Sequence, residues 1–234
     1  RALILLVGLC LLVAQVAACA TTPKPKGEVI VYTATPLSGW QADGGQTVVG
    51  GVRLMAERIN AAGGLLGYRV KVVALDDEAN SDVAVQVAEE IRNAIQQGSK
   101  VIGVVGHYNS GQSLAAMEIY KDLPIIVVTP TATDVSLTQK GYTNFFRVNA
   151  TDAAQAPVDA RFLVQNLGAK RIAVVYANNE YGRGLRTQML AALQELGGKP
   201  VVVIEIVEAA PTQAKAVEQI KAVQPDAIFL AGYE

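Results

Sequence analysis

The 234-residue chain carries 20 Lys and Arg residues against 21 Asp and Glu residues, and 51% of its residues are hydrophobic. This near balance of charge argues against a nucleic-acid-binding surface and against an acidic partner, which both favour an excess of positive charge. A chain of this length fits one or two domains, and its hydrophobic content is ample for a buried core.

The first residues are typical of an export signal. Arg1 precedes an almost wholly apolar run, Ala2–Val13, and small residues follow up to Cys19. Because a basic flank, an apolar stretch and small residues before a cleavage point make up a signal peptide, we expect residues 1–18 to be one. An uncleaved membrane anchor is the alternative, although the run is short for a membrane span of ~20 residues. The missing initiator Met indicates that a few residues precede Arg1.

Cys19 closes the segment Val16–Cys19, which resembles a bacterial lipobox. In a lipobox the cysteine is lipidated and becomes the mature N-terminus, so we expect residues 19–27 to be a lipidated tether on an extracytoplasmic, membrane-anchored protein in the periplasm or at the cell surface. The other cysteine, Cys10, lies inside the signal. No thiol is then left for a disulfide or a metal site in the body of the protein, and we expect no metal ion and no cofactor.

Short apolar runs alternate with helical patterns from Glu28 to the end of the chain. The strands expected are 28–35, 68–75, 101–105, 125–128, 144–148, 171–176, 201–206 and 226–231. Helices are expected between most of them, for example over 46–62 and 112–120, with Met55 on the buried face of the first and Phe162, Leu163 and Leu167 on a later one. This alternation predicts an α/β fold with parallel sheets flanked by helices.

Two segments of the chain have a similar layout. Lys100–Gly111 and Lys170–Gly182 each run from a basic residue through a strand to an Asn-containing turn closed by Gly. This weak repeat favours two lobes of related topology, with lobe 1 over residues 28–148 and lobe 2 over 149–234. Because the chain ends directly after a strand, we expect lobe 2 to be incomplete.

Two polar turns follow strands in lobe 1, namely Gly106–Gly111 and Thr129–Thr133. Ligands of parallel sheets bind outside the carboxyl ends of the strands, and the first turn also opens a helix, whose N-terminus attracts anions. The two turns are therefore expected to grip a ligand together. Plainer interpretations remain open, since Ser110 can be a helix cap and Thr131 and Thr133 can bond their own turn.

Three other features have a structural interpretation. His107, the only histidine, is expected to form local hydrogen bonds. Asp76 and Asp77 follow a strand without a further metal-ligand pattern, so we interpret them as structural or hinge residues. The glycine pairs at 44–45 and 50–51 lack the spacing of phosphate-binding loops.

A set of short motifs in the same order along the chain carries a family resemblance. The motifs are Pro36–Gly39, Asn60–Gly64, Asp76–Asp77, Gly106–His107 with Ser110, Thr131–Thr133, Phe146–Arg147, Tyr181–Gly182 and Pro225–Asp226 with Ala231–Tyr233. With them the chain resembles the substrate-binding lipoproteins of branched-chain amino-acid (leucine, isoleucine, valine) ABC transporters, which have the two-lobed type I periplasmic-binding fold.

The resemblance implies a binding site for an amino acid between the lobes. Ser110 would bind the α-carboxylate, and Thr133 would meet both carboxylate and ammonium, helped by main-chain groups of Thr131 and Ala132. Tyr181 and Tyr233 would close over the ligand from lobe 2. The acidic residue that usually completes the ammonium site would lie beyond the last residue.

The sequence departs from the family at one position of the side-chain pocket. Gly44 stands where relatives carry an aromatic residue, and Trp40 lies four residues earlier. The resemblance implies a non-enzymatic protein that delivers a branched-chain or small neutral amino acid, or a related polar ligand, to ABC permease subunits by lobe closure. A ligand-sensing domain of a signalling receptor is the alternative. An enzyme on a doubly wound fold is a further one, without a nucleophile–base pair to support it.

Overall fold

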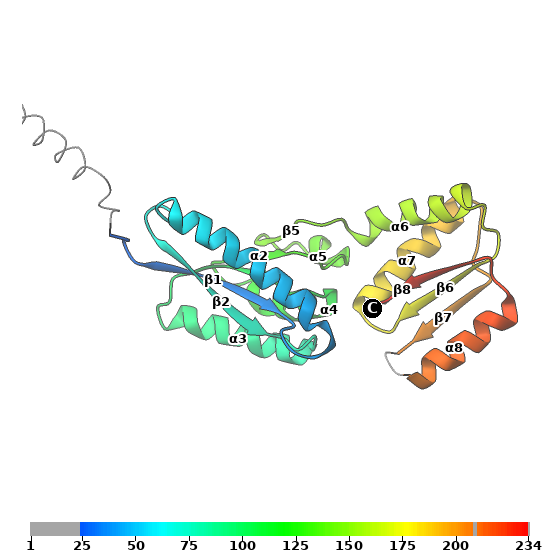
Figure 1. Cartoon of the computed structure of the whole chain (residues 1–234), viewed down its shortest axis with the longest axis horizontal. Helices are drawn as coiled ribbons and strands as arrows, with labels where there is room; N and C mark the ends of the chain where they lie inside the picture. Colours follow the sequence, from blue (N-terminus) through cyan, green and yellow to red (C-terminus); the bar gives the residue numbers. More distant parts are fainter. Residues whose placement is uncertain (1–23, 208–209, 234) are drawn as a thin grey trace, which may run out of the picture.

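The computed structural model describes residues 24–207 and 210–233, which form two parallel β-sheets with helices on their faces (Figure 1). The first sheet has the strand order β2-β1-β3-β4-β5 and the second the order β7-β6-β8. Every neighbouring pair of strands is parallel, so the α/β class predicted from the sequence is confirmed. The strands are β1 (Glu28–Thr35), β2 (Arg69–Asp76), β3 (Val101–Gly106), β4 (Ile126–Thr129), β5 (Phe145–Arg147), β6 (Ile172–Ala177), β7 (Val202–Ile206) and β8 (Ala227–Ala231).

The helices lie between these strands in the order that a parallel sheet requires. They are the 3₁₀ turn η1 (Gly39–Gln41), α2 (Ala42–Ala61), α3 (Ser81–Gln96), α4 (Ser110–Tyr120), α5 (Ser136–Gln139), α6 (Asp152–Arg161), the π-helical turn η2 (Phe162–Asn166), α7 (Glu180–Glu195) and α8 (Ala210–Val223). Asn80 caps α3 by accepting hydrogen bonds from the main-chain N–H groups of Asp82 and Val83; the sequence offers Asn80 or Ser81 for this position, and the structure uses Asn80.

The helices cover opposite faces of the first sheet. On one face α3 and α4 bury Ile91, Met117 and Tyr120 against strand residues such as Val104 and Val127. On the other face α2 packs against β1 and β2 through a smaller apolar cluster (Figure 1). The larger cluster lies directly behind the turns that follow β3 and β4, and it gives those turns a rigid base.

The second sheet is covered in the same way. Helices α6 and α7 bury Leu185 and Met189 against Val174 of the central strand. Helix α8 packs on the opposite face, where Ala216 meets Val175 and Ile204. The chain crosses from the first sheet to the second between β5 and α6.

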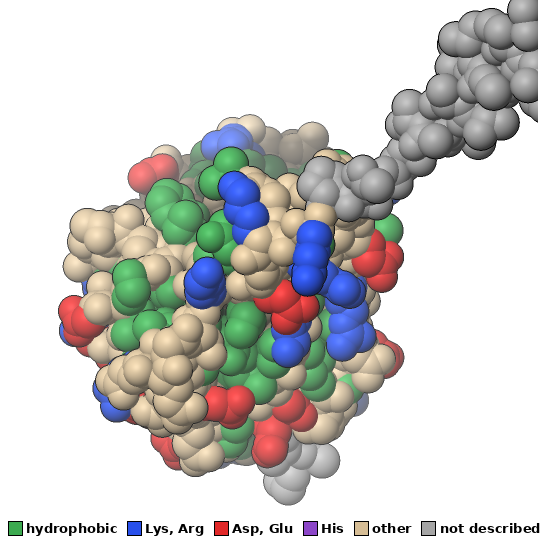
Figure 2. Space-filling view, turned by 90° about the vertical axis from the view of Figure 1, so that its left-hand side faces the viewer, with side chains coloured by type: hydrophobic (Ala, Val, Ile, Leu, Met, Phe, Trp, Pro, Cys, Tyr) green, Lys and Arg blue, Asp and Glu red, His purple; other side chains and the backbone are tan. Residues whose placement is uncertain are grey.

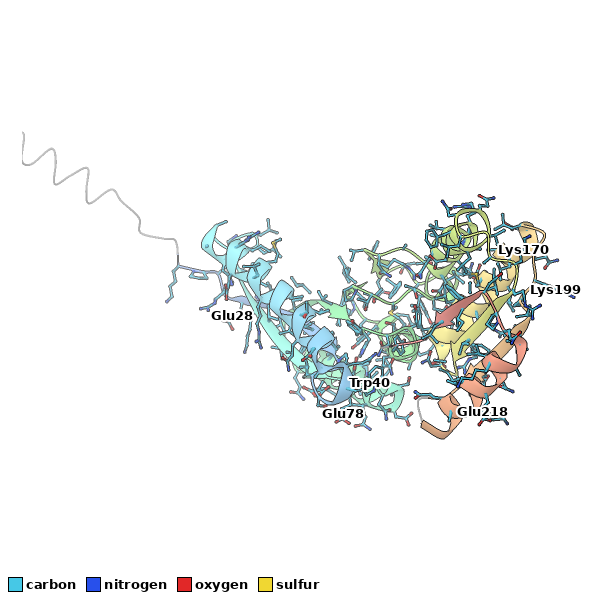
Figure 3. All side chains as sticks on the ribbon, turned by 45° about the vertical axis from the view of Figure 1, so that its right-hand side comes forward. Glu28, Trp40, Glu78, Lys170, Lys199 and Glu218 are labelled. Atoms are coloured by element: carbon cyan, nitrogen blue, oxygen red, sulfur yellow. The ribbon has the colours of Figure 1, made fainter. Side chains whose placement is uncertain are left out.

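The carboxyl ends of the two sheets face each other. In Figure 3, Trp40 and Glu78, which follow β1 and β2, lie on the side of the first sheet that is turned towards the second, whereas Glu28 at the start of β1 lies at the far end. Lys170 and Lys199, which precede β6 and β7, lie at the opposite end of the molecule. The edge at which parallel sheets bind ligands is thus the edge where the sheets meet.

Two helix starts differ from the sequence-based boundaries. Helix α2 begins at Ala42 rather than near residue 46, so Gly44 and Gly45 lie in its first turn. The helix passes so close to the preceding loop that a Cβ on Gly45 would lie 1.7 Å from the carbonyl oxygen of Pro36. Helix α4 begins at Ser110 rather than residue 112, directly after the polar turn.

Some residues expected in the core are exposed. Met55 is 54% exposed; Ala56, expected on the same face, is buried as predicted, and Val49 is buried with it. Phe162 and Leu167 are 53% and 60% exposed, while Leu163 is buried. The π-helical turn over these residues adds a residue per turn, and this shifts the side-chain register away from the 3.6-residue period that predicted the face.

Figure 2 views the end of the molecule that carries the first sheet, where Lys and Arg side chains alternate with Asp and Glu. Within residues 24–207 and 210–233, no helix has the length and apolar character needed to cross a bilayer. The predicted signal peptide and Cys19 lie outside the described residues.

Candidate ligand-binding site

A pocket of about 410 Å³ lies between the carboxyl ends of the two sheets. Its walls are formed by Trp40, Gln41, Gly44, Tyr108, Asn109, Ser110, Thr131, Ala132, Thr133, Tyr181, Gly232 and Tyr233. All six residues predicted to bind a ligand, Ser110, Thr131, Ala132, Thr133, Tyr181 and Tyr233, are among them. The structure therefore brings them together, and their contact with a ligand stays a prediction.

Ser110 links the two polar turns of the first sheet. Its hydroxyl oxygen accepts hydrogen bonds from the main-chain N–H groups of Thr133 and Asp134, each at 3.3 Å. It is not the helix cap, because Asn109 takes that position and its side chain donates to Oε1 of Gln41 at 2.7 Å. A hydroxyl has one donor and two acceptor sites, so these two bonds use the acceptor sites of Ser110 and leave its proton to be donated elsewhere.

The threonines of the second turn have different roles. The Thr131 hydroxyl donates to the carbonyl oxygen of Tyr108, so it holds the two turns together. The N–H of Ala132 donates to the hydroxyl of Thr129 at 3.0 Å. The hydroxyl of Thr133 is buried and has no hydrogen-bonding partner in its own turn; the group near it is the Asp152 carboxylate, whose pKa it lowers. A purely structural role in holding the turns therefore suits the side chain of Thr131, but not that of Thr133.

A buried polar network supports the first turn from behind. The Nδ1 of His107 lies 2.7 Å from Oδ2 of Asp77, and its Nε2 lies 3.3 Å from the Tyr120 hydroxyl. The main-chain carbonyl of His107 accepts from the Thr129 hydroxyl at 2.8 Å and from the Ser113 hydroxyl at 3.2 Å. Burial, with the Asp77 charge, raises the pKa of Tyr120, so its phenol stays neutral. His107 thus forms the expected local bonds and fixes both turns.

Stacked aromatic rings form the wall contributed by the second sheet. The rings of Tyr181 and Tyr233 are 5.0 Å apart at 18°, and Trp40 reaches Tyr233 at 5.9 Å from the first sheet. Tyr181 follows the N-terminus of α7, where Asn179 accepts the N–H of Gly182 at 2.8 Å. Burial, followed by the Asp152 and Asp159 charges, raises the pKa of Tyr181, so it presents a neutral hydroxyl.

Tyr108 takes the space that Gly44 leaves at the side-chain end of the pocket. A Cβ on Gly44 would lie 2.7 Å from the Tyr108 hydroxyl oxygen. An aromatic residue at position 44, as the resemblance implied, could not fit beside Tyr108 without moving it. The departure from the family motif therefore goes with an aromatic ring supplied by the neighbouring turn, together with Trp40.

Sequence analysis missed several residues at the site. Tyr108 and Asn109 lie in the turn Gly106–Gly111, which was predicted to contact a ligand, so their position in that turn could have identified them. Gln41 lies outside both predicted turns, and no motif pointed to it. Asp152 was visible only as a residue at a helix start, yet its side chain is fully buried behind Thr133. Across the described parts of the chain, no three metal-ligating side chains gather in one group.

The two sides of the pocket also touch beside it. Glu180 at the start of α7 places its carboxylate against the N-terminus of α4, so that a Cβ on Gly111 would lie 2.5 Å from Oε2 of Glu180. A negative charge is favourable at a helix N-terminus. Arg183 lies 2.9 Å from the other carboxylate oxygen and holds Glu180 in place.

Comparison with known proteins gives these features a context. An amino acid binding protein of Pseudomonas aeruginosa is 33% identical over 205 residues, which is 88% of this chain and 54% of that protein. The Leu/Ile/Val-binding protein of Escherichia coli is 30% identical over 207 residues, 88% of this chain and 55% of the relative. The chain thus spans about half the length of these curated relatives.

Solved structures show the same fold. The branched-chain amino acid transporter substrate-binding protein LivJ of Streptococcus pneumoniae, determined with isoleucine, superposes with a TM-score of 0.76 at 26% identity. The match covers 87% of this chain and 56% of that one. The leucine binding protein LivK of Thermotoga maritima gives a TM-score of 0.75 at 28% identity over 86% of this chain and 55% of its own. The parallel sheets facing across a pocket are therefore those of a type I periplasmic-binding fold.

The family model described as periplasmic binding protein matches residues 33–234. This range begins within β1, contains all the later strands of both sheets, and includes every residue of the pocket wall. The order of motifs, the fold and the pocket agree with that match, and the chain belongs to the periplasmic binding protein family.

Proposed function

We propose that this protein binds an amino acid in the pocket between the two sheets, with a branched-chain or small neutral side chain preferred. The observation that carries the proposal is the bonding of Ser110, whose two acceptor sites are used by Thr133 and Asp134 while its proton is left to donate. Ser110 also begins α4, so free N–H groups of that helix surround it. This arrangement suits a carboxylate.

The opposite end of the ligand meets acceptors. Thr133 lines the same wall as Ser110, and its hydroxyl has Asp152 beside it as a proton acceptor, which leaves its lone pairs to accept from a ligand. A zwitterion needs donors at one end and acceptors at the other, and charge-assisted hydrogen bonds are about twice as strong as neutral ones. The relatives named for leucine, isoleucine and valine binding support the amino-acid class.

Titration calorimetry tests this proposal. The purified protein is titrated with each of the twenty amino acids, and the best ligand is compared with its carboxamide, which lacks the carboxylate. We expect binding of at least one neutral amino acid and a loss of at least tenfold in affinity for the carboxamide. An absence of heat with all twenty contradicts the amino-acid assignment, and equal affinity for the carboxamide contradicts the role given to Ser110.

The proposal extends to delivery. The two sheets would belong to two lobes, 28–148 and 149–234, that close on the ligand, since only the closed state lets it contact both walls. The closed form would then dock on the membrane subunits of an ABC permease, and the bound molecule would be released chemically unchanged, without enzymatic turnover. Deletion of the gene should abolish cellular uptake of the ligand identified by calorimetry; normal uptake contradicts delivery.

We further propose that the protein works outside the cytoplasm, held to the membrane by a lipid on Cys19. The lipobox-like segment that ends at Cys19 supports this. Replacement Cys19→Ser should release the protein from the membrane fraction and remove incorporation of labelled palmitate; Cys10→Ser is the matched control. Retention of the Cys19→Ser protein in the membrane would favour an uncleaved anchor instead.

A further inference from the structure

Asp152 is a fully buried carboxylate directly behind the pocket wall. It is 0% exposed at the first position of α6, and its main-chain N–H donates to the carbonyl oxygen of Thr133 at 3.0 Å. The Thr133 hydroxyl lies close enough to the Asp152 carboxylate to lower its pKa as a hydrogen-bond donor does. Neither group has a hydrogen-bonding partner elsewhere among the described residues. Buried polar groups nearly always bond all their partners, so a carboxylate supported by one hydroxyl alone calls for an explanation.

The titratable groups that face Asp152 come from three other parts of the chain, and Tyr181 among them is neutral. Asp134 follows β4, Arg147 belongs to β5, and Tyr181 belongs to α7. A Cβ on Gly184 would lie 2.8 Å from Oδ2 of Asp152 and 3.0 Å from Oδ2 of Asp134, so the two carboxylates converge.

Arg147 does not neutralise this pair by direct contact. Its guanidinium donates to the carbonyl oxygens of Ala132 at 3.0 Å and Asp134 at 2.8 Å, and to the Thr138 hydroxyl at 3.2 Å. Two acidic side chains therefore face one arginine that donates its hydrogen bonds to neutral oxygens. The region behind Thr133 holds an excess of negative charge that a cation on the pocket side of Thr133 would balance.

We propose that Asp152 is a positioning residue for a ligand ammonium group and acts through the Thr133 hydroxyl. The hydroxyl donates its proton to the Asp152 carboxylate, and its lone pairs then accept an N–H from the ammonium. This inference rests on the proposed function and deepens it, because it assigns the charge that makes the site select ligands with a cationic end.

The inference implies a pH dependence. Burial raises the pKa of Asp152 to about 6; the Thr133 hydroxyl and Arg147 oppose the rise, and the Asp134 charge adds to it. A ligand ammonium favours the charged carboxylate, so binding lowers this pKa and releases a proton near pH 6. Tyr181 does not titrate in this range, since its pKa is raised from an already high value.

The test compares the best-binding amino acid with its deamino analogue, the carboxylic acid of the same carbon skeleton. Affinities are measured by calorimetry at pH 5 and pH 7.5 for the unmodified protein, for Asp152→Asn and for the control Asp159→Asn on the same helix. We expect the unmodified protein and the control to bind the amino acid about tenfold more weakly at pH 5, because about a tenth of Asp152 is charged one unit below its pKa.

Asp152→Asn should bind the amino acid at least tenfold more weakly than the unmodified protein at pH 7.5, with no further loss at pH 5. Its affinity for the deamino analogue should stay within threefold. Equal losses for both ligands would show a structural role and overturn the inference, as would an unchanged affinity and pH profile for the amino acid. If the unmodified protein binds none of the twenty amino acids, the proposed function fails first and the inference with it.

A second measurement does not depend on the variant folding. Titration of the unmodified protein at pH 6, in two buffers that differ in ionisation enthalpy, counts the protons released on binding. We expect a release of about half a proton with the amino acid, because half of a group is protonated at its pKa. A release of zero would overturn the inference.

Discussion

The two walls of the pocket are built in different ways. The wall from the first sheet consists of two turns fixed by hydrogen bonds, with Ser110 and the His107 carbonyl each joining one turn to the other. The wall from the second sheet presents the stacked rings of Tyr181 and Tyr233. The first wall presents hydrogen-bonding groups at fixed positions, and the second presents the aromatic surface of stacked rings. A ligand would therefore be recognised by the first wall and covered by the second.

The largest effect should come from the network that holds the first wall in place. Asp77 is fully buried and bonds His107, and its other carboxylate oxygen accepts the N–H of Ala79 at 3.1 Å. Asp77→Ala removes both bonds and leaves a buried imidazole without this partner. We expect a loss of about 3 kcal/mol or more in the free energy of unfolding, measured by urea denaturation, as for other broken buried polar pairs.

The control for this change is Asp122→Ala at an exposed position at the end of α4. It should change stability by less than about 0.5 kcal/mol, as surface substitutions usually do. If Asp77→Ala behaved like the control, the buried network would not support the turns, and the contrast between a wall fixed by hydrogen bonds and a wall of stacked rings would lose its basis.

The second prediction concerns the link between the turns. Ser110→Ala removes the proposed donor to the carboxylate and leaves the N–H groups of Thr133 and Asp134 without their acceptor. We expect ligand binding to weaken by about 1.5–3 kcal/mol, the range for a hydrogen bond to a charged group. Calorimetry with the best amino acid measures this change.

Ser113→Ala is a matched control for Ser110→Ala. Ser113 lies one turn further along α4, is also buried, and donates to the His107 carbonyl without lining the pocket. Its loss should reduce stability by about 1 kcal/mol and leave the affinity within threefold. Equal effects of the two changes on affinity would mean that Ser110 acts only by supporting the turn.

The two walls also differed in how far the sequence predicted them. The turn after β3 was predictable because an apolar run, a Gly-punctuated polar segment and a helix follow one another locally between Val101 and Tyr120. Because β3 and β4 are parallel neighbours, their carboxyl ends lie at the same edge of the sheet, and the two turns that follow them were predictable neighbours. The aromatic wall depends on contacts between distant segments, for example Trp40 with Tyr233, and for it the family resemblance rather than local pattern supplied Tyr181 and Tyr233.

Other features could not be read from the pattern at all. The burial of Asp152 depends on how the start of α6 meets the turn of Thr133, and Asp and Thr at a helix start normally indicate only a cap. Tyr108 covers Gly44 because the turn after β3 meets the start of α2, so closely that a Cβ on Gly44 would lie 2.7 Å from the Tyr108 hydroxyl oxygen; no local signal encodes this approach. Local sequence patterns thus predicted the strands, helices and turns. Which polar groups become buried at the site depends on contacts between distant segments, and the patterns did not predict it.

The smallest effect is expected at the aromatic wall. Two substitutions of Tyr181 distinguish the contribution of its ring to binding from that of its hydroxyl. Tyr181→Ala removes the ring that stacks on Tyr233. Because aromatic pairs contribute about 0.5–1.5 kcal/mol beyond burial, we expect the affinity for the amino acid to fall about fivefold. Tyr181→Phe keeps the ring and should bind within twofold of the unmodified protein by calorimetry. If Phe lost as much affinity as Ala, the Tyr181 hydroxyl would bond the ligand directly, and the second wall would recognise the ligand as well as cover it.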